Sequence, residues 1–300
     1  MPDPSAVVGN STDWQPFECA RWRADLVREV SGLAQEPYLP GDGGAELVPP
    51  SFLSAQYVDA FALGIPDAPA RLNGGNECRW LADVRVGDRL ERKSTVVGAD
   101  VKTGRTGRLE IYTIETIYRR AGAGEPVARL GYTAIRRYPN EAGSADTAAP
   151  RPSDTAAPRP SRVDRPREEA SVPAGATKLF VTSVAPRDVV RYAVATDDLY
   201  EAHYDESFAR ASGLPGTIVH GLLKMAWLAR GALEYGGAGS VVREISATYR
   251  GMDLVGESFT VWALPDGDTD GAGATRLRLF GQSHSGAIST TGTAVIEHRK

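Results

Sequence analysis

The sequence predicts an α+β fold in which two similar halves each place a curved antiparallel β-sheet around a central α-helix. One observation is that the same order of predicted elements, helix and then strands, occurs on both sides of a segment poor in large apolar side chains, residues 140–176. Another is that residues 217–235 are apolar on nearly every side, as expected of a buried helix. Several further runs alternate apolar and polar residues with a period of two, which is typical of antiparallel strands with one buried face.

The composition limits the class of protein. A chain of 300 residues favours about two domains, and 42% hydrophobic with 24% charged residues is ordinary for a globular protein. A net charge of −4 shows no basic excess, which argues against nucleic-acid binding, and no apolar run approaches the roughly 18 residues of a membrane helix. The two cysteines, Cys19 and Cys78, and a polar N-terminus predict a cytoplasmic protein without a disulfide scaffold or an all-cysteine metal site.

The chain is predicted to hold two domains joined by a linker. Residues 146–153 and 154–161 both read DTAAPRPS, inside a stretch rich in Pro, Ala, Arg and acidic residues. Such a stretch buries too little apolar surface to order itself, and its prolines favour an extended spacer. We therefore predict an N-terminal domain over 1–139, a disordered linker over 140–176 and a C-terminal catalytic domain over 177–300.

In the N-terminal half, helical spacing of apolar residues is followed by alternating strands. Residues 20–34 have apolar side chains at helical intervals, and Pro49-Pro50 precedes a second helical candidate, residues 51–64. In the strand candidate at 108–118, the odd-numbered residues from Leu109 to Ile117 follow a period of two. The other predicted strands are 89–101 and 127–138.

In the C-terminal half a similar order recurs around the apolar segment. Asp205 and Gly213 bound a short helix, because they suit its N-terminal and C-terminal caps. Gly236-Gly237 ends the long apolar helix. Since each half repeats the order, the two halves are expected to pack as a pseudo-dimer. The remaining predicted elements are helix 187–195 and strands 178–184, 241–250, 258–264, 275–283 and 288–299.

Asp198 and His203 are the first candidates for chemistry, because all four histidines lie in the last third of the chain. On one continuous helix a spacing of five would place the two side chains about 140° apart. If the chain turns between them, they can converge on one cleft as a general acid–base pair. The alternative is structural, since Asp and His near helix starts commonly act as caps.

His220 and Gly221 are the second candidates, since they open the apolar helix. The free N–H groups of a first helical turn, together with the helix dipole, favour negative charge. A thioester carbonyl that gains enolate character would be stabilised there, with the Gly221 amide as donor. The alternative for the His220 side chain is a core histidine that hydrogen-bonds to the backbone.

These residues carry a resemblance to a known family. From Val184 to Leu264 the chain resembles MaoC-like dehydratases and (R)-specific enoyl-CoA hydratases, whose signature is Asp-x-Asn-Pro-x-His followed by Gly-Leu-Pro-Gly-x-Ile-x-His-Gly. Here Asp198 and His203 have the first spacing, and residues 213–221 read GLPGTIVHG. The N-terminal half resembles the degenerate domain of the two-domain members, with Pro49-Pro50-Ser51-Phe52 at a helix start and residues 72–77 (LNGGNE) as a turn.

The resemblance implies a double hotdog fold and a function. It implies a hydro-lyase that acts on 3-hydroxyacyl or 2-enoyl thioesters, with Asp198 and His203 as the acid–base pair and the Gly221 amide at the thioester carbonyl. It implies no metal and no redox cofactor. The substrate would be carried on CoA or on the phosphopantetheine of an acyl-carrier protein, with no nucleic-acid or membrane partner and a possible homodimer.

The sequence departs from the family pattern around the pair. Tyr200 and Glu201 stand where the family has Asn and Pro, and Asp197 replaces a glycine. We expect Tyr200, Glu201 and His220 to shape the pocket, and a buried Glu201 would favour protonated His203. Two alternatives therefore stay open: a repurposed enzyme of secondary, polyketide-type metabolism that catalyses another elimination, a conjugate addition or a cyclisation, and a non-catalytic thioester-binding subunit.

Overall fold

The computed structural model forms one curved antiparallel sheet of ten strands in the part of the chain that it describes, residues 3–40, 46–104, 107–122, 124–139, 171–267 and 273–299. The strand order is β1-β3-β4-β5-β2-β7-β10-β9-β8-β6. The strands are β1 (Gln15–Glu18), β2 (Ala70–Trp80), β3 (Arg89–Gly104), β4 (Gly107–Arg120), β5 (Pro126–Pro139), β6 (Thr177–Thr182), β7 (Ser240–Tyr249), β8 (Phe259–Pro265), β9 (Ala274–Gln282) and β10 (Ile288–His298).

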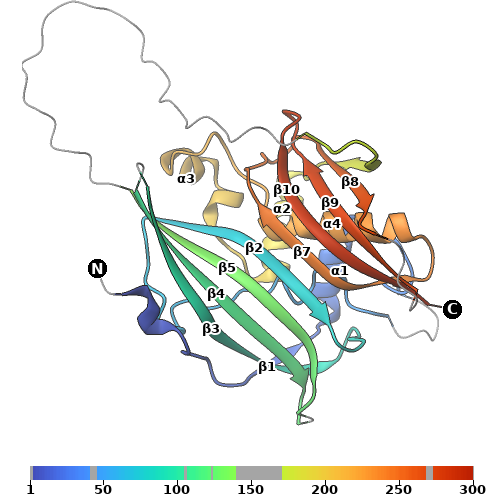
Figure 1. Ribbon diagram of the computed structural model, residues 1–300, viewed down its shortest axis with the longest axis horizontal. Helices are drawn as coiled ribbons and strands as arrows, with labels where there is room; N and C mark the ends of the chain where they lie inside the picture. The colour runs from blue at the N-terminus through green and yellow to red at the C-terminus, as the bar shows by residue number, and fades with distance from the viewer. Residues whose placement is uncertain are drawn as a thin grey trace, which may run out of the picture.

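The two halves of the sheet repeat one pattern and meet at their centre. In each half the first long strand, β2 or β7, lies at the middle of the ten-stranded sheet and pairs with the last strand of its own half, β5 or β10. The strands β2 and β7 pair antiparallel with each other and so join the two halves. Figure 1 shows β2–β5 in cyan and green beside β7–β10 in orange and red. This arrangement confirms the predicted α+β double hotdog class. Of the predicted linker, residues 140–170 lie outside the described residues.

The helices lie mainly with the C-terminal half. Most side chains of α4 are buried, including Trp227 and Leu228, and the helix contacts β7, β8, β9 and β10. The prediction of a buried central helix is therefore confirmed. No helix in the described ranges has the length and apolar character needed to cross a bilayer. The helices are η1 (Pro4–Val7), α1 (Arg21–Ser31), α2 (Pro186–Thr196), η2 (Glu201–His203), α3 (Glu206–Ala211) and α4 (Gly221–Gly236).

The helix predicted over residues 51–64 is wrong, because this segment folds as turns. The Asp59 carboxylate accepts hydrogen bonds from the backbone N–H groups of Phe61 and Ala62, at 3.0 and 3.1 Å. Such a local bond competes with the helical hydrogen-bond ladder. Leu63 and Ile65 are nevertheless fully buried, in a cluster with side chains of β3, β4 and β5. The turns therefore cover the N-terminal sheet where a helix was expected.

Residues 72–77, predicted as a turn, lie inside strand β2. The register of β2 against β5 shifts between Asn73 and Gly75, and the Asn73 side-chain oxygen accepts the Gly75 N–H at 3.0 Å. The Asn-Gly-Gly sequence therefore makes a β-bulge and does not end the strand. In β4 burial alternates with a period of two, and Tyr112, Ile114 and Tyr118 point inward.

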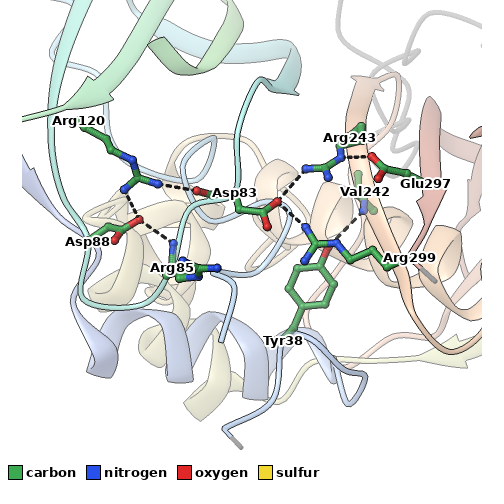
Figure 2. Close-up of polar contacts among 9 residues, drawn as sticks. All are labelled: Tyr38, Asp83, Arg85, Asp88, Arg120, Val242, Arg243, Glu297 and Arg299. Carbon is green, nitrogen blue, oxygen red and sulfur yellow. Dashed lines mark hydrogen bonds and ion pairs between the residues drawn. The ribbon is translucent and has the colours of Figure 1, made fainter. Parts of the chain in front are cut away.

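A network of ion pairs around Asp83 links the two halves (Figure 2). The Asp83 carboxylate, just after β2, accepts hydrogen bonds from Arg243 of β7, at 3.0 Å, and from Arg299. Arg243 also donates to Glu297 of β10 at 2.5 Å. The Asp83 carbonyl accepts a further bond from Arg120 of β4 at 2.8 Å. Asp83 thus links β4 of one half to β7 of the other.

Replacing Asp83 with Asn is expected to lower the free energy of unfolding by about 1–2 kcal/mol, since two guanidinium groups lose a shared charged acceptor that is partly exposed. Urea unfolding measures this change. Asp100→Asn, at an exposed position of β3, is the matched control and should change stability by less than about 0.5 kcal/mol. Equal effects of the two substitutions would show that the network does not stabilise the contact between the halves.

Candidate active site

A cavity of about 540 Å³ lies where the two halves face each other. Its C-terminal wall includes Asp198, His203 and Gly221, and its N-terminal wall comes from the turns at 53–61 and from strands β2, β4 and β5. The wall therefore combines both halves. The turn segment that replaces a helix in the N-terminal half forms part of it.

The chain turns between Asp198 and His203, as the acid–base hypothesis requires. Helix α2 ends at Thr196, and Asp197 follows in the left-handed conformation with φ of 61°. This is the position where the family pattern has glycine, and Asp tolerates the conformation better than most residues with a side chain. The short helix η2 then carries His203 back toward Asp198, so that its Nε2 lies 4.0 Å from the Asp198 Oδ2.

Hydrogen bonding fixes the tautomer of His203. Its Nδ1 lies 2.8 Å from the carbonyl oxygen of Ile218, which can only accept, so Nδ1 carries the proton and donates. The lone pair of the neutral ring is then on Nε2, which faces Asp198 and the cavity. The Asp198 side chain is 30% exposed, whereas that of His203 is 10% exposed. A substrate atom that enters the cavity can thus reach both groups.

His220 supports this pair from behind. Its ring stacks on that of His203 with centroids 3.7 Å apart, and its Nε2 donates to the backbone carbonyl of Asp198 at 3.2 Å. It is fully buried and is not part of the cavity wall. The His220 side chain thus lies in the core with a hydrogen bond to the backbone, and any effect on pocket shape is indirect.

Burial moves the pKa values of the pair toward each other. Burial raises the pKa of the Asp198 carboxyl above 3.8, against the opposing effects of His203 and of the Tyr200 N–H that donates to it. Burial lowers the pKa of His203 below 6.5, against the Asp198 charge. The pKa of His220 lies well below 6.5, because of its burial and its neighbour His203. Both imidazoles are therefore neutral at neutral pH.

Gly221 is the first residue of α4, and its N–H is one of the first-turn donors that have no acceptor within the helix. A Cβ at this position would lie 3.0 Å from the Tyr249 ring, so glycine lets that ring pack against the start of the helix. Both residues line the cavity. An oxyanion placed there would meet the N-terminal end of the α4 dipole.

Tyr200 and Glu201, the residues that depart from the family pattern, differ in their surroundings. Tyr200 lines the cavity, and its ring meets the rings of His203 and Phe208 edge to face, with centroids 6.0 and 5.6 Å away. Glu201 also lines the cavity but is exposed. Glu201 was expected to favour protonated His203 only if it were buried. Because it is exposed, this effect is not expected.

Asp198, His203 and His220 each offer a ligand atom within 4.8 Å of the others, as a metal site would require. A tetrahedral zinc ion with bonds of about 2.1 Å needs ligand atoms about 3.4 Å apart, and His203 and Asp198 are 4.0 Å apart. The two stacked rings also lie in nearly parallel planes, whereas an ion bound by both lone pairs would have to lie in both planes. The arrangement suits proton transfer better than metal binding.

Sequence reasoning missed several residues of the cavity. Tyr249 lines the cavity and donates to Asn76 at 3.2 Å. Lys224 in α4 and two arginines of the N-terminal half, Arg71 and Arg136, also line it. A single charged residue in the otherwise apolar first part of the helix, residues 221–229, was the available signal for Lys224. The arginines gave none, because only strand pairing brings them to the cavity.

Comparisons with known proteins agree with this geometry. The model of the MaoC-like domain matches residues 164–277, and that of the FAS1-like dehydratase domain region matches residues 44–130. No curated protein matches the chain by sequence.

Solved structures share the fold over the whole length. A MaoC-like dehydratase is 17% identical with a TM-score of 0.77, covering 99% of this chain and 100% of that one. A MaoC-like dehydratase from Phytophthora capsici is 17% identical with a TM-score of 0.65, covering 97% of each chain. A Mycobacterium tuberculosis protein described as a double hotdog fold is 15% identical with a TM-score of 0.64, covering 96% of each.

The two family-model matches support hydro-lyase activity on hydroxyacyl or enoyl thioesters. They join a MaoC-like domain that holds the Asp198–His203 pair to a dehydratase-like N-terminal region. The chain therefore contains a MaoC-like domain over residues 164–277 and a FAS1-like dehydratase region over residues 44–130, on a double hotdog fold.

Proposed function

We propose that the protein interconverts 3-hydroxyacyl and 2-enoyl thioesters by elimination or addition of water, with Asp198 and His203 as the acid–base pair. The single observation that carries this proposal is the placement of the pair: a neutral imidazole with its lone pair on Nε2 and a carboxyl group 4.0 Å away face one cavity. Both groups can reach one substrate, as concerted removal and delivery of protons requires.

In dehydration, His203 Nε2 accepts the proton from C2 and the electron pair of that C–H bond forms the C2–C3 double bond. The C3–O bond breaks, and Asp198, with its pKa raised by burial, gives a proton to the departing hydroxyl, which leaves as water. The proton on His203 then returns to Asp198. Hydration is the reverse of these steps.

The start of α4 has a separate role in this mechanism. Removal of the C2 proton moves negative charge onto the thioester oxygen, and the Gly221 N–H is placed to donate to it. A fixed backbone donor of this kind typically contributes about 10²- to 10³-fold to a rate. The acyl chain extends toward the N-terminal wall, and the carrier, CoA or the phosphopantetheine of a carrier protein, enters from the surface.

The rate is expected to fall at acidic pH, because protonated His203 cannot accept a proton. Since burial lowers the pKa of His203 below 6.5, the acidic limb of the kcat/KM profile should have its midpoint below pH 6.5. Initial rates of dehydration of one 3-hydroxyacyl thioester across a pH series measure this midpoint. A midpoint above 6.5 would contradict the neutral imidazole proposed here.

The proposal is tested by a panel of 2-enoyl thioesters of increasing chain length, each prepared on CoA and on an acyl-carrier protein. Loss of the enoyl absorbance reports hydration. Turnover of at least one member supports the hydro-lyase. The carrier, CoA or acyl-carrier protein, whose thioesters give the higher kcat/KM is then the carrier that the enzyme prefers. Silence across the panel from folded protein that still binds the thioesters would favour a non-catalytic thioester-binding subunit.

One observation favours a second candidate, a repurposed enzyme of secondary metabolism. Tyr200 places an aromatic ring beside His203 where the family has the smaller Asn. A ring there narrows the space next to the pair, and a phenol can donate or accept a proton in a different elimination or addition. Restoring Asn and Pro at positions 200 and 201 separates the candidates, because a repurposed reaction would be lost while simple hydration would persist or improve.

A further inference from the structure

Arg136 of β5 is a buried cation at the cavity wall. The residue is 3% exposed, and it lines the cavity. Its Nε donates to the carbonyl oxygen of Pro66 at 3.0 Å. Among the described residues no carboxylate lies within 4.0 Å of its guanidinium, and that is its one hydrogen bond. The terminal amino groups of Arg136 are therefore left for the cavity.

The carboxylate opposite Arg136 in the sheet already has other partners. Glu110 is the register partner of Arg136 on β4. One of its oxygens pairs with Arg108 at 2.8 Å, and the other accepts from the hydroxyls of Tyr112 and Tyr138 at 2.8 and 3.4 Å. The negative charge of Glu110 partly offsets the positive charge of Arg136, but its oxygens form no hydrogen bond or ion pair with Arg136.

A second arginine lies opposite Arg136 in the sheet. Arg71 of β2 is the register partner of Arg136 on β5, and opposite residues of paired strands project from the same face. Arg71 also lines the cavity, and its guanidinium carbon lies 5.6 Å from the centre of the Tyr200 ring. In the described part of the chain its one carboxylate partner is exposed Asp67, at 3.8 Å. Tyr200 in turn contacts His203, so Arg71 lies within two ring contacts of the acid–base pair.

We infer that Arg136 and Arg71 form an anion subsite in the cavity, which binds a carboxylate or phosphate group carried by the thioester substrate. This inference rests on the proposed function in naming a thioester as the ligand. A guanidinium removed from water without a paired anion is unfavourable, and a charge-assisted bond to a bound anion compensates it. The anion is either a carboxylate at the far end of the acyl group or a phosphate of the carrier arm.

Binding of unreactive thioesters tests the subsite and distinguishes the two sources. Calorimetric titration compares pentanedioyl-CoA with pentanoyl-CoA, together with a longer homologous pair, and the same acyl groups on N-acetylcysteamine, which has no phosphate. If the anion is an acyl carboxylate, the dioyl ester binds about 10- to 100-fold more tightly than its partner on both carriers. If it is a phosphate, both CoA esters bind more tightly than their N-acetylcysteamine counterparts.

In either case Arg136→Met is expected to abolish the preference, and Arg71→Met, at a more exposed position, to reduce it without risk to the fold. Arg129→Met is the matched control, because Arg129 lies on the same strand and pairs with Glu115, outside the cavity wall.

Preferences that are absent, or that survive both cavity substitutions in folded protein, overturn the subsite. Because these esters are saturated, the result does not depend on turnover: a subsite without hydration refutes the proposed function alone, and hydration without a preference refutes the subsite alone.

Discussion

Replacing His203 with Ala, or Asp198 with Asn, is expected to reduce kcat by about 10²- to 10⁴-fold, the range typical of a lost general acid or base. His203→Ala removes the Nε2 lone pair that accepts the proton. Asp198→Asn keeps the size of the side chain but removes the group that donates to the leaving hydroxyl. The measurement is the initial rate of enoyl thioester hydration by each variant beside the wild type.

The two substitutions should be far from additive, since the pair acts as one unit. The double variant is therefore expected to have nearly the same kcat as the less active of the two single variants. Circular dichroism and thermal unfolding check that each variant is folded. His284→Ala, at an exposed histidine that contacts Ser258, is the control and should retain wild-type rates. Folded variants with rates within threefold of the wild type would remove both residues from the mechanism.

Replacing Lys224 with Met is expected to destabilise the protein by about 3–5 kcal/mol, the usual effect of breaking a buried ion pair from one side. The Lys224 Nζ lies 2.8 Å from Asp253 Oδ2 and 2.9 Å from the Gly251 carbonyl, and the side chains of both charged residues are no more than 5% exposed. Ser289 also donates to the same carboxylate oxygen at 2.8 Å. Without Lys224, the Asp253 charge keeps only a neutral partner.

Urea unfolding measures this effect, and two further variants identify its cause. Arg210→Met breaks a pair with Glu206 whose side chains are at least 60% exposed, and it should change stability by less than about 1 kcal/mol. Adding Asp253→Asn to Lys224→Met should recover part of the loss, because the buried charge is removed. A Lys224→Met protein as stable as the Arg210→Met protein would contradict the buried-pair explanation.

The same ion pair also holds the segment that orients the site. The Asp253 carbonyl accepts the Val219 N–H at 2.8 Å, and the preceding carbonyl, that of Ile218, holds His203 Nδ1. Lys224 itself is one turn along α4 from Gly221. The buried Lys224–Asp253 pair therefore helps to position both the His203 imidazole and the first turn of α4.

The C-terminal half was predictable because its local signals agree. A helix that is apolar on nearly every side must be buried, and the GLPGTIVHG segment leads directly into it. The convergence of Asp198 and His203 could be stated only as a condition, since it depends on one left-handed residue, Asp197. Left-handed conformation is ordinary for glycine, so an aspartate at that place gave little indication of the turn.

The N-terminal half was harder to predict because tertiary contacts overrode local signals. Two prolines and spaced apolar residues favoured a helix over 51–64, yet Asp59 caps a turn within it. The Asn-Gly-Gly sequence of β2 is typical of a turn, yet pairing on both sides with β5 and β7 keeps it in a strand. Arg136 reached the cavity through strand register alone, which no local pattern specifies.

The central claim is that this cavity adds or removes water across C2 and C3 of an acyl thioester by the two side chains Asp198 and His203. The most direct test is hydration of an enoyl thioester in deuterium oxide, with the product examined by NMR. The account predicts a 3-hydroxyacyl thioester with one deuterium at C2, formed by the wild type and lost in both His203→Ala and Asp198→Asn. A product without a C3 hydroxyl, or the same labelled product formed at wild-type rates by either variant, would contradict it.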